Sequence, residues 1–194
     1  MNKFNKEQKI IALQYINKLL KKYNIKAKIT KHGWAGRAFP YSKNERPKIR
    51  IPNPTNLLKL GTAIHEIGHI ILGHCKYKNN NNKYIDNRPN YMQEYEAEQF
   101  SINKLKKLGF YTKDYETEAI RYVLENIAQA YNKKHPLNKI PKKIIKWTGL
   151  KKNTWKKYEK VFVPREQNDF KSKKDIIIQF KLPNKSIYKN KFNK

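Results

Sequence analysis

The sequence predicts an α+β fold, with a mainly helical domain over residues 1–135 that contains a small sheet and a basic C-terminal extension over residues 136–194. In several long segments apolar residues recur at spacings of three and four, which is typical of helices packed on a core. Two short stretches alternate apolar and charged residues, which is typical of half-exposed strands. A chain of 194 residues is long enough to bury one core and still carry an additional segment.

Four helices are expected, over residues 6–23, 55–72, 90–108 and 114–132. Thr55 is the expected N-cap of the second helix, since it precedes a strongly periodic run. The predicted core-facing stripes of the first two helices are Ile10, Leu13, Ile16, Leu20 and Tyr23, and Leu57, Leu60, Ile64, Ile67 and Ile71. Those of the last two are Ala97, Ser101, Leu105 and Leu108, and Ile120, Leu124, Ile127 and Tyr131.

Two strands are expected before the second helix, over residues 25–29 and 48–51. They place a small sheet beside this helix. In the extension we expect short helical pieces near Trp147 and Trp155 and a strand over 176–182, which alternates apolar and polar residues.

The chain carries 44 Lys and Arg against 15 Asp and Glu, a formal charge of +29. Residues 1–60 contribute +13, residues 61–130 contribute zero and residues 131–194 contribute +16. Such flanks attract anionic partners, so nucleic acid, an anionic membrane surface and an acidic protein are all candidates. The alternative is coding bias, because 38 of the basic residues are Lys and the chain also holds 22 Asn and 22 Ile. Both interpretations stay open on composition alone.

Composition also argues against several classes of protein. Cys75 is the only cysteine, which excludes an internal disulfide and a cysteine-only zinc site. The apolar runs are too short for a transmembrane segment, and the N-terminus lacks the apolar core of a signal peptide. We therefore expect a cytoplasmic protein. The oligomeric state is not predicted.

The run His65-Glu66-Ile67-Gly68-His69 is an H-E-x-x-H motif inside a strongly periodic helix. Residues i and i+4 share one helical face, so the two imidazoles can bind one zinc ion. Glu66 points beside that ion, where it can act as general base on a zinc-bound water. The alternative is that both histidines simply find hydrogen-bond partners in the folded protein and bind no metal. This alternative suits a helix of Ile, Leu, Gly and Ala poorly, because burying polar groups is costly.

A third ligand is needed, and the acidic start of the next helix supplies candidates. A third histidine at the metzincin spacing would fall at position 75, which is Cys75. Glu94 and Glu98 share a face at i and i+4, so Glu94 can bind the ion while Glu98 supports a zinc-bound histidine from behind. The alternative is that these acids only complement the helix dipole.

Residues 45–105 resemble the ImmA/IrrE-type zinc metallopeptidases. The resemblance is carried by the strand at Lys48–Pro52, by the H-E-I-G-H run with the following Leu72-Gly73-His74, and by Glu94-Tyr95-Glu96-Ala97-Glu98-Gln99-Phe100-Ser101. It implies a metallopeptidase-like domain with a thermolysin-like ligand set. His65, His69 and Glu94 would bind zinc and Glu66 would be catalytic. Glu98 stands where the family commonly has Asn or Asp.

The expected function is therefore that of a zinc metalloendopeptidase acting on a protein or peptide substrate. In proteins of this type the substrate tends to be a DNA-associated regulator, often linked to phages or mobile elements. The alternative is a basic nucleic-acid-binding or phage accessory protein, in which zinc is structural and Trp34, Trp147 and Trp155 lie among lysines. Packaging in a virion is a third hypothesis, from composition.

An oxyanion-stabilising residue is expected, and the sequence leaves six candidates: His32, His74, Tyr91, Tyr111, Tyr115 and His135. The glycine-containing loop over residues 33–36 is expected to border the cleft. The strand with Ile49 and Ile51 is expected to pair with substrate backbone along its edge. Cys75 is interpreted as a buried thiol.

Overall fold

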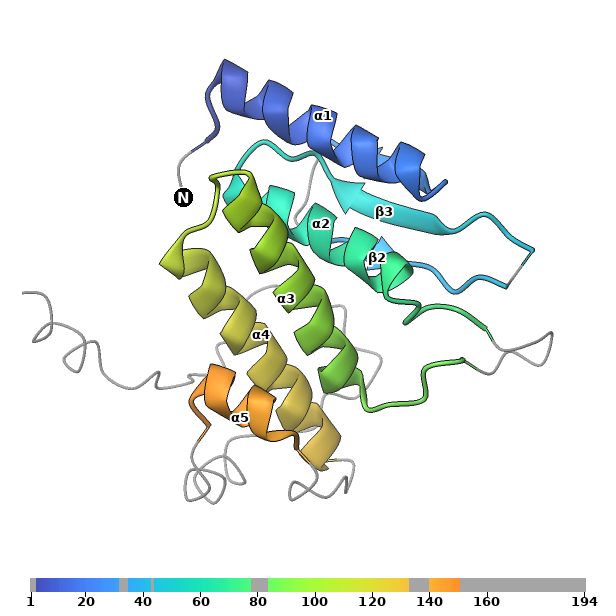
Figure 1. Cartoon of the computed structure of the whole chain (residues 1–194), viewed down its shortest axis with the longest axis vertical. Coiled ribbons are helices and arrows are strands. Elements are labelled where there is room, and N and C mark those ends of the chain that lie inside the picture. The colour runs from blue at the N-terminus through green and yellow to red at the C-terminus, as the bar shows by residue number, and fades with distance from the viewer. Residues whose placement is uncertain (1–2, 32–34, 43, 78–83, 133–139, 151–194) are drawn as a thin grey trace, which may run out of the picture. The chain divides into compact units, whose positions relative to one another are not determined.

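The computed structural model describes residues 3–31, 35–42, 44–77, 84–132 and 140–150 (Figure 1). Within them the order of elements is α1 (Lys6–Lys22), β1 (Lys26–Thr30), β2 (Arg37–Ala38), β3 (Lys48–Pro52), α2 (Leu57–Ile71), α3 (Asn90–Lys107), α4 (Lys113–Asn132) and α5 (Lys142–Thr148). The mixture of helices with a small sheet confirms the α+β prediction. None of the described helices is long and apolar enough to cross a membrane.

The sheet has the strand order β1-β3-β2. β1 pairs with β3 in parallel along its whole length, and β2 pairs with the other side of β3 in antiparallel fashion. β3 is therefore the central strand, and the expectation that the strand of Ile49 and Ile51 offers a free edge to substrate is wrong. The edge strand on that side is β2. It has only two residues, too few to show an alternation of apolar and polar residues in the sequence.

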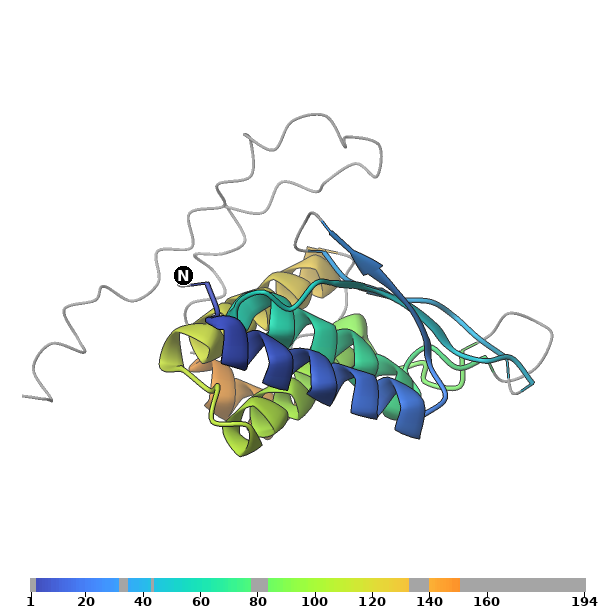
Figure 2. The same cartoon turned by 90° about the horizontal axis from the view of Figure 1, so that it is seen from above.

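One face of the sheet packs on the helices. Ile49 and Ile51 are fully buried and belong to the same core cluster as Ile16 of α1 and Ile64 of α2. In Figure 2 the helices lie to one side of the strands. The alternate residues of β3, Lys48 and Arg50, are exposed, so the pleat gives the sheet one apolar face and one cationic face.

α1 begins with a capping box in which Asn5 and Gln8 exchange side-chain and backbone hydrogen bonds. Its buried residues are Ala12, Ile16 and Leu19, whereas Ile10 is 46% and Tyr23 is 37% exposed. The buried stripe is thus centred about one residue away from the predicted one. The predicted stripe includes only large apolar residues and therefore leaves out Ala12, which lies at the contact.

α2 is the most buried helix of the described chain. Its N-cap is Asn56 rather than Thr55, and the Asn56 side chain accepts a hydrogen bond from the backbone of Lys59 at 3.0 Å. Leu60, Ile64 and Ile67 are fully buried, as the predicted stripe requires.

α3 packs between α2 and α4. Its predicted face is confirmed at Ala97, Ser101 and Leu105, which are fully buried. On α4 the buried residues include Tyr115, Ala119, Val123 and Ile127, while Ile120 and Leu124 are half-buried. The core side of α4 is therefore rotated relative to the predicted stripe, because alanine and valine again occupy the closest contact.

The predicted helical piece near Trp147 is α5, which packs on α4. The Trp147 indole donates a hydrogen bond to Glu116 at 3.0 Å and its ring contacts Tyr95 edge-on. The predicted pieces at Trp155 and 176–182 lie outside the described residues, as do His32, Trp34 and His135. The division between residues 1–135 and 136–194 stays a prediction.

Candidate metal centre

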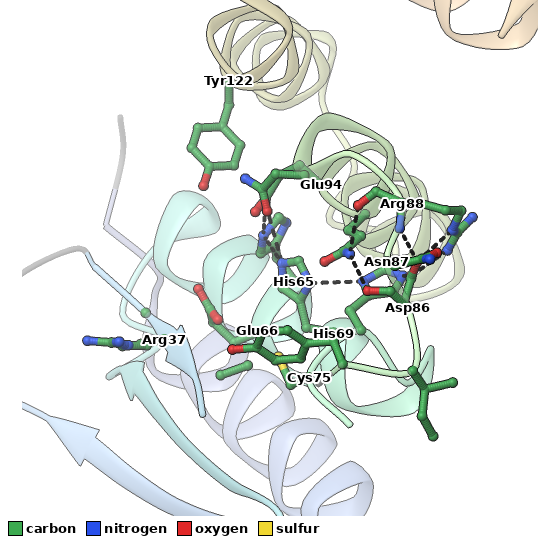
Figure 3. A pocket seen from close by; sticks show the side chains of 17 residues that line it. Arg37, His65, Glu66, His69, Cys75, Asp86, Asn87, Arg88, Glu94 and Tyr122 are labelled. Carbon is green, nitrogen blue, oxygen red and sulfur yellow. Dashed lines mark hydrogen bonds and ion pairs between the residues drawn. The ribbon is translucent and has the colours of Figure 1, made fainter. Parts of the chain in front are cut away.

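Three side chains that could bind one metal ion come together: His65 and His69 from α2 and Glu94 from α3 (Figure 3). One ligand atom from each lies within 4.8 Å of the others, and all three residues are buried. The two Nε2 atoms are 3.0 Å apart, and Glu94 Oε2 lies 3.1 Å from His65 Nε2 and 3.4 Å from His69 Nε2. Ligands at tetrahedral corners about 2.05 Å from zinc are about 3.3 Å apart, so these separations suit one ion.

Two further observations favour a cation here. Glu94 Oε2 is buried without a hydrogen-bond partner, although it faces both imidazoles. Three carboxylates, Glu66, Glu94 and Glu98, surround two imidazoles that are neutral when they bind a metal. Burial lowers the pKa of His65, but Glu98 and Glu94 outweigh that effect and raise the pKa well above its ordinary value. The cluster therefore favours positive charge, and it could hold a metal ion.

Glu98 lies behind His65, on the side away from the cluster. Glu98 Oε1 is 3.1 Å from His65 Nδ1, and Glu98 Oε2 accepts a hydrogen bond from the Tyr115 hydroxyl at 3.1 Å. The same hydroxyl lies 2.9 Å from Ser101 Oγ, which donates to the carbonyl of Gly61 at 3.0 Å. This buried chain ties the orientation of His65 to the backbone of its own helix. The structure thus brings Glu98 to the far nitrogen of His65, where the sequence placed it.

His69 has an equivalent support, which the sequence did not assign. His69 Nδ1 lies 2.9 Å from Nδ1 of His74, and His74 Nε2 lies 3.3 Å from Glu96 Oε2. A His69 that binds metal through Nε2 carries its proton on Nδ1 and donates it to His74. His74 then carries its own proton on Nε2 and donates it to Glu96. Every hydrogen bond in this chain is satisfied by that one arrangement of protons.

The turn after α2 places His74. Gly73 has φ +78°, the left-handed conformation, and the backbone N–H groups of Gly73 and His74 bond to the carbonyls of Ile70 and His69. These are the two hydrogen bonds of a Schellman motif, which ends a helix and turns the chain back on it. His74 is only 2% exposed as a result.

Arg88 holds the outer end of the His74 chain. Its guanidinium bonds to Glu96 at 2.8 Å and to Asp86 at 2.7 Å. The hydrogen bonds from Arg88 lower the pKa of both carboxyl groups below their ordinary values. Glu96, which does not share the helical face of Glu94 and Glu98, therefore supports His69 through His74.

Glu66 lies next to the cluster without belonging to it. Burial raises its pKa, and the backbone N–H of Ala38 in β2 offers it a hydrogen bond. Gly36 packs on the Glu66 side chain so closely that a Cβ atom there would clash with it. The edge of the sheet thus fixes the position of this carboxylate.

The cluster opens into a cavity of about 860 Å³. Gly36 and Ala38 line the cavity. Gly36 agrees with the expectation that the glycine-containing loop borders the cleft, while residues 33 and 34 of that loop lie outside the described residues. Arg88 lies on the other side of the cluster from Arg37 (Figure 3), and Gln93 and Cys75 also line the cavity. Burial raises the pKa of the Cys75 thiol to about 12, so the residue is a partly buried neutral thiol.

Tyr122 of α4 is a residue of this cavity that the sequence reasoning missed. Its ring meets His65 edge-on at 5.9 Å. The side chain is 40% exposed as a whole, but partial burial and the nearby Glu94 and Glu66 carboxylates raise the pKa of its phenol, so the hydroxyl keeps its proton. In Figure 3 the hydroxyl points toward the metal cluster. Among the described candidates named from sequence, Tyr115 bonds to Glu98, Tyr111 bonds to Glu116, and His74 supports His69. Tyr91 is buried at 4% exposure and does not line the cavity.

Comparisons with known proteins identify no matching family model, no matching curated protein and no matching solved structure. The function of this chain is therefore inferred from the geometry of the site.

Proposed function

We propose that this chain is a zinc-dependent metallopeptidase that hydrolyses peptide bonds in a protein or peptide. The observation that carries the proposal is the convergence of His65, His69 and Glu94 on one point, with the Glu66 carboxylate beside it in an 860 Å³ cavity. Two histidines and a glutamate are the ligand set of a catalytic zinc site that keeps an open position. A structural site would more often be closed by four protein ligands.

When bound, zinc would supply Lewis acidity, which activates a water molecule and polarises a carbonyl oxygen. Glu66 would take a proton from the attacking water and pass it to the leaving amine. The Tyr122 hydroxyl, which stays protonated, would donate a hydrogen bond to the carbonyl oxygen as it gains charge. Glu98 and His74 hold the two imidazoles in orientation.

The outer edge of β2 is the proposed docking edge for the substrate backbone. The ladder pairs Arg37 with Arg50 and Phe39 with Lys48 toward β3, so the backbone groups of Ala38 point to the other side, where Glu66 and the cavity lie. An extended peptide that pairs with this edge would pass alongside Glu66.

The test compares Glu66→Gln with the wild type. The matched control is Glu7→Gln, which changes an exposed residue of α1 in the same way. Zinc content is measured by elemental analysis, and cleavage is measured by mass spectrometry on a mixed-sequence peptide library. We expect about one zinc per chain in all three proteins, and cleavage lowered by about 10²-fold or more in Glu66→Gln alone. Equal cleavage by Glu66→Gln and the wild type would contradict the proposal, as would a wild-type protein that binds zinc and leaves the library intact.

A further inference from the structure

The exposed face of the sheet is built almost entirely of cations. In the strand register Lys26 lies opposite Lys48, Lys28 lies opposite Arg50, and Arg50 also lies opposite Arg37. All five side chains are exposed. We call these five residues, together with Phe39, the cationic sheet face.

This arrangement is unfavourable for the sheet by itself. Like charges directly opposite each other on paired strands destabilise the pairing, and here each cation of β3 has a cation beside it. None of the paired positions on this face holds a carboxylate. Binding a polyanion would remove the repulsion and release the counterions that screen it.

The spacing suits an extended polyanion. Neighbouring strands lie about 4.8 Å apart and alternate residues of one strand about 6.6 Å apart. The five cations therefore form a grid on which several phosphates of one strand can be contacted together. Long Lys and Arg side chains adapt to the exact phosphate positions.

An aromatic ring lies at the edge of the same grid. The Phe39 backbone N–H bonds to the Lys48 carbonyl at 3.0 Å, which continues the ladder by one residue and places Phe39 on the face of Arg37. The Arg37 guanidinium lies 5.4 Å from the centre of the Phe39 ring. Proteins that bind single-stranded nucleic acid combine such cations with aromatic rings on which bases stack. A membrane-binding surface would instead be expected to carry an apolar face that inserts between lipids.

We propose that the cationic sheet face binds single-stranded nucleic acid through its phosphates, with Phe39 as a stacking ring for a base. The cations are different residues from Glu66, His65, His69 and Glu94. The inference therefore does not rest on the peptidase activity, and Glu66→Gln should bind nucleic acid as the wild type does.

The test uses the full chain and a fluorescein-labelled 20-nucleotide oligo-dT, with binding measured by anisotropy between about 50 and 300 mM KCl. The test variant is Lys28→Gln with Arg50→Gln. The matched control, Lys107→Gln with Lys142→Gln, removes the same charge from exposed residues of α3 and α5. We expect Kd to rise about tenfold or more in the test variant, and the slope of log Kd against log salt to fall by about 1.4, since each phosphate contact on a single strand contributes about 0.7. The control should change Kd by no more than about twofold.

Several outcomes would overturn the proposal. Equal losses in the test and control variants would show that the location of the charge is irrelevant. Failure of the wild type to bind oligo-dT, or binding of phosphatidylserine vesicles in its place, would reject nucleic acid as the ligand. Phe39→Leu keeps every charge, so an unchanged affinity would reject the stacking role. Thermal melting checks the fold, and removing like charges should leave Tm unchanged or raise it.

Discussion

The Nδ1 atoms of His69 and His74 lie 2.9 Å apart, and this contact joins a candidate metal ligand to a residue outside the H-E-x-x-H motif. A neutral His69 that donates a hydrogen bond from Nδ1 through this contact has its Nε2 free to bind an ion. His74 therefore selects the tautomer of His69, and the Glu96 carboxylate selects that of His74.

Replacing His74 should weaken zinc binding without unfolding the protein. We expect His74→Phe to raise the Kd for zinc by about 10- to 100-fold, because His69 loses its acceptor. His74→Asn should recover part of the affinity, since its side-chain oxygen can lie near the position of Nδ1. Competition with a chromophoric chelator measures both. Identical affinities for His74→Phe and the wild type would show that the contact does not orient His69.

Zinc should stabilise the fold. Zinc at 100 times its Kd adds about 2.7 kcal/mol to the free energy of unfolding of the wild type, provided that the unfolded chain does not bind it. Glu94→Ala should abolish most of this gain, because it removes one of three ligands. The measurement is Tm with zinc and with a chelator. A Tm shift of the same size in Glu94→Ala would exclude Glu94 as a ligand.

Gly36→Ala tests the contact between the sheet edge and Glu66. The added Cβ would clash with the Glu66 side chain and displace it, although the metal ligands stay in place. We expect peptide cleavage to fall by about 10²-fold, as for other misplacements of about 1 Å, with zinc content unchanged. The control is Ala35→Ser, at the preceding exposed residue. Full activity in Gly36→Ala would mean that the position of Glu66 is not critical.

Tyr122→Phe tests the proposed hydrogen bond to the carbonyl oxygen. Removing one such donor typically lowers kcat by about 10²- to 10³-fold. Zinc affinity should stay the same, because the phenol is not part of the ligand cluster. Steady-state kinetics on a cleaved peptide gives the answer, and a change confined to KM would indicate a binding role instead.

Glu116 should make the fold sensitive to acid. Burial alone would raise its pKa, but hydrogen bonds from Lys113, Tyr111 and Trp147 lower it from 4.5 to about 2. The unfolded chain therefore binds a proton at higher pH than the folded one. The stabilisation by Glu116 is complete above about pH 4.5 and is lost as pH falls toward 2. Melting the wild type and Glu116→Gln between pH 7 and pH 2.5 should show the advantage of the wild type shrinking across that window; a constant difference would contradict this.

The parts of the site that follow from local spacing could be predicted. His65 and His69 meet because i and i+4 share a helical face, and Glu94 and Glu98 share a face for the same reason. The supports of His69 could not be predicted in this way. Asp86 and Arg88 belong to an irregular segment, and the periodicity of apolar residues does not predict the path of such a segment.

The pattern of apolar residues also could not predict how whole helices and strands are oriented. Tyr122 points into the cavity because α4 is rotated about its axis relative to the predicted stripe, with small Ala119 and Val123 at the contact. The order of the strands depends on how the chain crosses from β1 to β3. The two residues of β2 are too few for an alternating pattern to predict an edge strand.

Gly73 fixes the sequence spacing between the candidate metal ligands and His74. The glycine ends α2 in the one register that returns His74 to His69, so an insertion or deletion between them would separate the two rings while leaving the helix intact. The unit that selection would preserve is then ten residues, from His65 to His74, with a glycine in the ninth place. Proteins that share this longer signature should share the histidine support, even where the rest of their chains has diverged.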